Sequence, residues 1–252
     1  MAWHDDPEHP FAGIAEKLKR AEQNIINLDS EISLFIQSGR YPVIPDQNSE
    51  EWKEALAYHR SKTVPLRFSV LAGEIVHHLR SCLDHIIWHF ADAAGRATPI
   101  EFPVFKTEPM KQSEIDRYEG KIKGIKKAGV LYLISEMQPY KARADAANHA
   151  LLIIHNMDRF DKHRELAIVD SSVEVDFSTA PDELRRRALL FSQKKLPESE
   201  HLALGRALRD YKATPGVAFK EFGELNCYPM ISGLRVLWNW VSEAVTGFSA
   251  EV

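Results

Sequence analysis

A long run of apolar residues at alternating spacings of four and three begins near the N-terminus of this 252-residue chain. It lies between Phe11 and Ser38 and consists of Ile14, Leu18, Ala21, Ile25, Leu28, Ile32 and Phe35. This spacing is a heptad seam, which places the apolar side chains on one face of a helix. Such a helix packs lengthwise against other helices, so the seam predicts a helical bundle. The same seam would serve a homodimer.

The rest of the chain adds further helices and a shorter region with a different period. Residues 66–93, 110–137, 143–159 and 230–248 have helical patterns, and prolines make 98–105 extended. Residues 173–177 alternate between apolar and acidic, which predicts a strand, and 187–192 and 216–228 are two more strand candidates. We therefore expect one α+β domain over 1–252. In it, a mainly helical bundle (about 11–159 and 230–248) carries a small antiparallel β-sheet (about 164–228).

Composition excludes several classes of protein. With 44% hydrophobic and 27% charged residues the chain can form a core, and a net charge of −4 gives no overall attraction for nucleic acid. Two cysteines outside any CxxC pair indicate a reducing compartment. The N-terminus lacks the basic start and apolar run of a signal peptide, so we expect none, and no run approaches the ~20 apolar residues that span a bilayer. We expect a cytoplasmic protein with no membrane partner.

The helix predicted at 66–93 contains an unusual number of titratable residues, which fall on three faces. Its core stripe is Ile75, Leu79, Leu83, Ile86 and Phe90. Beside it runs a stripe of Glu74, His78, His85, His89 and Asp92, and the back carries His77, Arg80, Asp84 and Trp88. Arg80 and Asp84 are four residues apart, so they can form an ion pair within the helix.

Imidazoles and carboxylates on one face are the ligands that zinc or iron prefers. Glu74-x-x-His77 has the spacing of di-iron helical bundles, which need matching ligands from other helices. No second Glu-x-x-His lies on a convincing core helix. We therefore expect no metal and no cofactor, and a metal-binding bundle remains an alternative.

A second polar cluster occupies residues 155–166, HNMDRFDKHREL, where a helix passes into the strand region. Its Lys162, His163 and Arg164 could bind phosphate, and His163 could titrate near neutral pH. The alternative is a solvated run in which Asp158 and Asp161 neutralise nearby cations. Basic clusters at 121–127 and 185–187 lack interleaved aromatic residues, so they indicate RNA binding only weakly.

The hexapeptide Arg80-Ser81-Cys82-Leu83-Asp84-His85 resembles the Arg-x4-His signature of HEPN domains. The resemblance implies a helical, often dimeric, metal-independent ribonuclease. In it Arg80 would steady the scissile phosphate, and His85 would act in acid–base cleavage using the RNA 2′-hydroxyl. Ser81 stands where Asn or Asp is more usual. Arg80 and His85 are about 140° apart on an ideal helix, so a partner surface would have to complete the site.

Under this hypothesis the catalytic candidates are Arg80 and His85, assisted by His163 and Arg164. The binding candidates are Ser81, Asp84, Asp158, Asp161 and Lys162, and the substrate would be RNA. More broadly, HHLRSCLDHIIWHF, IEFPVF, QPY and DRFDKHREL look like a group of uncharacterised bacterial and phage-associated proteins, which implies no activity. A non-catalytic binding or assembly protein of unknown partner is the second hypothesis.

Overall fold

The computed structural model describes residues 6–38, 63–163, 169–175, 178–192, 196–208, 213–219 and 228–252, with Glu50, Glu54, Ala57 and Tyr211. By their contacts the residues divide into two compact units. Unit 1 comprises Met1–Ile25, Ala72–Glu165 and Leu234–Val252, and unit 2 comprises Ile26–Leu71 and Leu166–Gly233. The single-domain arrangement stays a prediction. Within the described residues, no helix is both long enough and apolar enough to cross a membrane.

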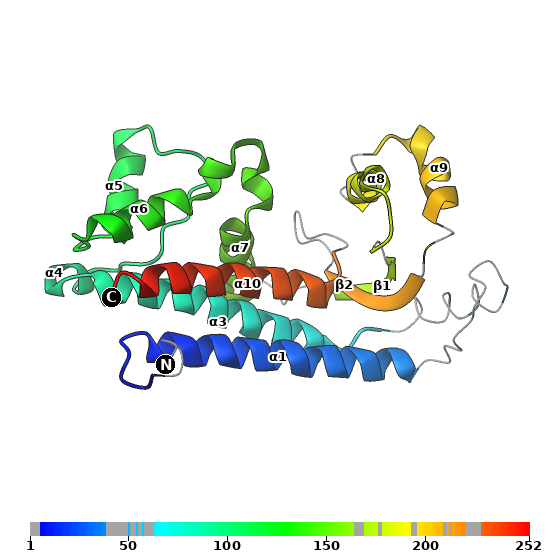
Figure 1. Ribbon diagram of the computed structural model, residues 1–252, viewed down its shortest axis with the longest axis horizontal. Helices are drawn as coiled ribbons and strands as arrows, with labels where there is room; N and C mark the ends of the chain where they lie inside the picture. Colours follow the sequence, from blue (N-terminus) through cyan, green and yellow to red (C-terminus); the bar gives the residue numbers. More distant parts are fainter. Residues whose placement is uncertain are drawn as a thin grey trace. The chain divides into compact units, whose positions relative to one another are not determined.

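The chain has three long helices, α1 (Ala12–Gln37), α3 (Leu66–Phe90) and α10 (Met230–Ser249) (Figure 1), and the larger part of α3 and α10 and the first half of α1 belong to unit 1. The predicted seam is buried, because Leu18, Ala21 and Ile25 of α1 are at most 6% exposed. Trp238 on α10 donates its indole N–H to the Leu18 carbonyl oxygen at 3.0 Å. Burying these stripes against one another removes apolar surface from water, which is the main force that stabilises such a bundle.

Shorter helices follow α3 in the chain. They are α4 (Ala93–Arg96), α5 (Gln112–Lys121), α6 (Ala128–Glu136), the 3₁₀ helix η2 (Pro139–Asn148) and α7 (Ala150–His163). Figure 1 shows α5, α6 and α7 on the side of α3 and α10 away from α1. The segment between α4 and α5 is not helical, as its prolines predict. Its Phe102 is fully buried and meets the Phe248 ring edge-on, with centroids 6.2 Å apart.

The residues that follow α3 explain why this helix ends at Phe90. Arg96 donates from Nε to the Trp88 carbonyl and from Nη2 to the His89 carbonyl, each at 2.9 Å, so the last carbonyls of α3 are capped. Asp92 then caps α4 by accepting the Gly95 amide at 2.9 Å. Gly95 lies against the backbone of the turn at 122–124, after α5, because a Cβ there would come within 2.1 Å of the Lys123 carbonyl oxygen.

The described residues of unit 2 include an antiparallel strand pair, β1 (Val169–Val175) with β2 (Ala213–Phe219), in the register Val169↔Phe219 to Val175↔Ala213. Between the strands come α8 (Asp182–Ser192) and α9 (Glu198–Leu208). These two helices share a small core of Ala180, Leu184, Leu196 and Leu204.

The mainly helical architecture predicted from the sequence is confirmed, and the helices expected at 11–38 and 230–248 correspond to α1 and α10. The strand predicted at 187–192 is wrong, because these residues belong to α8. Leu184 and Ala188, one helical turn apart, both pack into the small core of α8 and α9. The strand candidate at 216–228 overlaps β2 as far as Phe219, and its residues 220–227 lie outside the described part of the chain.

Candidate functional site

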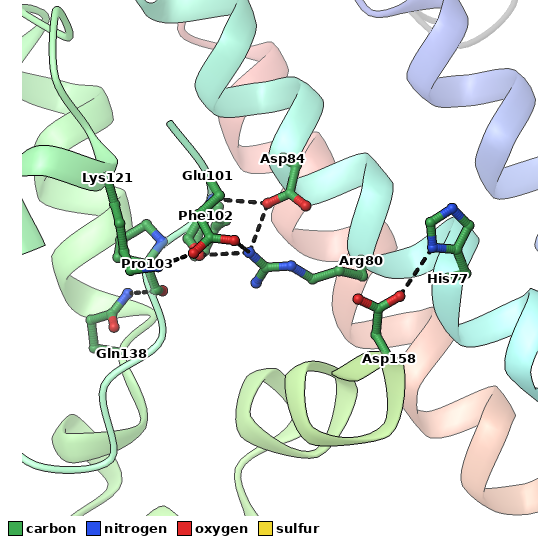
Figure 2. Close-up of polar contacts among 9 residues, drawn as sticks. All are labelled: His77, Arg80, Asp84, Glu101, Phe102, Pro103, Lys121, Gln138 and Asp158. Carbon is green, nitrogen blue, oxygen red and sulfur yellow. Dashed lines mark hydrogen bonds and ion pairs between the residues drawn. The ribbon is translucent and has the colours of Figure 1, made fainter. Parts of the chain in front are cut away.

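Arg80, the expected phosphate-binding residue, is buried, with its side chain only 3% exposed. Its Nη2 donates to Asp84 Oδ1 at 2.7 Å and to the Phe102 carbonyl oxygen at 2.9 Å, and reaches Glu101 Oε2 at 3.4 Å (Figure 2). The ion pair anticipated from the four-residue spacing is thus present. It is part of a larger tertiary network, whose members we call the Arg80 cluster: Arg80, Asp84, Glu101, Phe102 and Lys121.

The Arg80 cluster attaches the extended segment between α4 and α5 to α3. It does so through the backbone N–H and the backbone carbonyl of Phe102. Asp84 Oδ1 accepts the Phe102 amide at 2.9 Å, while Arg80 donates to the carbonyl of the same residue. Glu101 also forms an ion pair with Lys121 at the end of α5. Burial, and then the neighbouring Arg80, lower the pKa of Lys121, while Asp84 opposes this shift. Three parts of unit 1 are therefore connected by charged groups.

Gln138 anchors the same segment from the other end and is fully buried. Its Oε1 accepts the Phe105 amide at 3.1 Å, and its Nε2 donates to the carbonyl oxygens of Pro103 at 2.9 Å and Ile134 at 3.0 Å. Sequence reasoning missed this residue, since nothing local distinguishes it from a solvated glutamine. Its full hydrogen bonding is what a buried amide requires.

A second polar contact joins α3 to α7. His77 Nδ1 lies 3.0 Å from Asp158 Oδ1, across 81 residues of sequence (Figure 2). The Asp158 side chain is 10% exposed and that of His77 is 52% exposed, so the carboxylate is inside and the imidazole reaches the surface. Asp158, expected to bind substrate, thus contacts a histidine of α3.

His155 on α7 lies close to the Arg80 cluster. Burial lowers its pKa to about 4, with further lowering by Arg80, Arg159 and Lys121 and an opposing effect from Asp158. Arg80 Nη1 is buried and makes no hydrogen bond within the described residues. This region is thus an environment in which an added positive charge is unfavourable.

His85 is exposed on α3 and does not join the Arg80 cluster. Burial, and then Lys17 of α1, lower its pKa, so its ring lies near α1. Arg80 instead faces the extended segment. The structure therefore does not bring the two residues of the Arg-x4-His motif together within one chain, as their angular separation predicted. Ser81, between them, is half-buried.

The other candidate residues lie at the end of α7. The Asp161 carboxylate lies directly against Gly73 of α3, where a Cβ would come within 2.6 Å of it. Lys162 and His163 are the last two residues of α7, and their side chains lie outside the described part of the structure, as does Arg164. Their expected roles stay predictions.

No group of three or more His, Cys, Asp or Glu residues that could hold a metal ion occurs among the described residues. The basic clusters considered for RNA contact are largely paired with acids. Lys126 lies 2.9 Å from Asp92, and Arg186 lies 2.9 Å from Glu183. Cys82 is buried, and burial raises its pKa to about 12, which disfavours a thiolate nucleophile.

Comparison of the chain with protein-family models, with curated proteins and with solved structures finds no match. The HEPN-like resemblance therefore rests on the residues of this sequence alone.

Proposed function

We propose that this chain is a non-catalytic binding or assembly protein in which the Arg80 cluster is structural. The observation that carries this proposal is the state of Arg80, whose guanidinium is buried and bonded to Asp84 and to the Phe102 carbonyl. A phosphate-binding arginine needs donors directed at the ligand site. Here Nη2 of Arg80 is bonded to Asp84 and Phe102, and Nη1 is inaccessible to solvent.

The energy needed to redirect Arg80 supports the same proposal. Removing one partner of a buried ion pair costs about 3–5 kcal/mol, because the other charge is left without compensation. An RNA phosphate recruiting Arg80 would first have to break its bonds to Asp84 and to Phe102. That cost would equal or exceed the gain from a new charge-assisted hydrogen bond, which is worth roughly 1.5–3 kcal/mol.

The surface of unit 1 carries side chains of the kinds that binding interfaces use. Trp88 is 49% exposed, Tyr132 is 65% exposed and Met110 is 77% exposed. Aromatic residues and methionine are enriched at the centres of protein interfaces. These residues support a protein partner, which includes a second copy of the chain.

A cleavage assay on single-stranded RNA in metal-free buffer, paired with thermal unfolding, tests the proposal. We expect no cleavage by the wild-type chain, a large loss of stability in Arg80→Ala, and a change within about 0.5 kcal/mol in the exposed His85→Ala control. RNA cleavage that His85→Ala abolishes without lowering the unfolding temperature would overturn the proposal.

The metal-independent ribonuclease is a second candidate, and one observation favours it. The lowered pKa of His85 keeps its exposed imidazole neutral near pH 7, as a general base requires. This candidate needs a cation other than Arg80, supplied by a second copy or by the end of α7. The cleavage assay above separates the two candidates directly.

A further inference from the structure

His77 is oriented by a carboxylate in the way that metal-binding histidines usually are. Its Nδ1 is 3.0 Å from the carboxylate of Asp158, which accepts the Nδ1 proton. In the neutral ring Nε2 then carries the lone pair, and Figure 2 shows that this nitrogen points away from Asp158. Histidines that bind metals usually donate their other N–H to a carboxylate or carbonyl, which fixes the tautomer and the ring orientation.

Glu74 lies one helical turn before His77 and is exposed. No hydrogen bond or ion pair of its carboxylate is found in the described part of the chain, so the side chain is available to a ligand. Residues three apart are neighbours on a helix surface, with Cβ atoms about 5–6 Å apart. An oxygen and a nitrogen donor at this spacing can chelate one ion.

His78 is the alternative nitrogen donor, and its surroundings argue against it. His78 Nδ1 is buried and makes no hydrogen bond within the described residues, so no carboxylate fixes the tautomer or the orientation of its ring. His77 has a buried carboxylate beside it instead, so His77 is the better ligand.

We propose that Glu74 and His77 form one half of a zinc site, which the same two residues of a second copy of this chain complete. Zinc in structural sites takes four ligands in a tetrahedron, drawn from His nitrogen, carboxylate oxygen and thiolate. One chain supplies two of these four ligands, so a second copy has to supply the other two. The inference rests on the proposed assembly function, because it names the partner as a second copy and the bridging ion as zinc.

Sedimentation of the full chain in EDTA, and then with excess ZnCl₂, tests this site together with the zinc content of the protein after removal of free metal. We expect zinc to shift the chain from monomer to dimer, with one bound zinc for two chains. Glu74→Gln and His77→Ala should both abolish the shift. Glu74→Gln keeps the contact between His77 and Asp158, so its effect cannot come from lost folding. His85→Ala, exposed on the same helix, should respond like the wild type.

The zinc affinity of Asp158→Asn is a further test, because the loss of a purely structural contact would not change zinc binding. Asp158 is a positioning residue here, so its replacement should weaken zinc binding about 10–100-fold without removing a ligand. A chain that binds no zinc, a bound zinc without a change in mass, or equal responses of Glu74→Gln and wild type would each overturn the site. None of these results touches the non-catalytic proposal, which the RNA cleavage assay and the stability of the Arg80 variants test separately.

Discussion

Acidification should destabilise this protein through His155, and the structure sets the size of the effect. In the folded chain the pKa of His155 is lowered to about 4 by burial and by nearby cations, against 6.5 in an unfolded chain. The groups that face it are Arg80 on α3, Lys121 on α5, and Arg159 and Asp158 on α7. Three of these four are cations, and the remaining carboxylate already contacts His77.

The direction in which pH changes the free energy of unfolding follows from proton binding by the folded and unfolded chains. Between about pH 4 and 6.5 the unfolded chain binds a proton at His155 that the folded chain does not. The free energy of unfolding therefore falls as pH falls through this window, by about 1.4 kcal/mol for each pH unit. Over the whole window the loss is at most roughly 3 kcal/mol, because solvent screening around the partly exposed ring reduces it, and stability is retained above pH 6.5.

Denaturant unfolding of wild type and His155→Gln across this pH window measures the loss. Because His78, His85, His89 and His149 also have lowered pKa values, the wild-type slope includes further protons. The difference between the two proteins should therefore isolate His155, with the variant losing less stability on acidification. Asn156→Gln, an exposed substitution on the same helix, should behave like wild type. A difference that does not change with pH would refute the reasoning.

Three further substitutions have expected outcomes that chemical or thermal unfolding checks. Gly95→Ala should cost about 1–3 kcal/mol, because its Cβ would clash with the Lys123 backbone; no loss would contradict this contact. Arg143, at φ 51° and ψ −112° in η2, is strained, so Arg143→Gly should stabilise the fold by about 1 kcal/mol, and a lower melting temperature would argue against strain. Gln138→Met should cost about 2–4 kcal/mol by leaving buried backbone groups unpaired, which an unchanged unfolding midpoint would disprove.

Much of the helical fold could be predicted from the spacing of apolar residues, because a heptad seam identifies which face of a helix is buried. The strand predicted at 187–192 shows where this reasoning fails. Arg187-Ala-Leu-Leu-Phe-Ser192 is a short apolar run, which fits either a strand or a buried helix. The start signal upstream, Pro181 followed by Asp182 and Glu183, favours the helix that the structure shows.

The candidate site could be predicted only where its contacts are local. Arg80 and Asp84 are one helical turn apart, so their pairing follows from spacing. Their bonds to Phe102 depend on where an extended segment packs, and the contact between His77 and Asp158 joins residues far apart in sequence. Such contacts are set by tertiary packing, which helix periodicity does not encode.

A double-mutant cycle on Arg80 and Asp84 tests the structural role of the Arg80 cluster most directly. Arg80→Ala, Asp84→Ala and the double variant, compared by urea unfolding, give the coupling free energy between the two side chains. Because Arg80 is buried and both residues bind Phe102, we expect a coupling of about 2–3 kcal/mol. A coupling of about 0.5 kcal/mol or less, the size found for exposed pairs on one helix, would contradict the structural role and leave Arg80 free for a ligand.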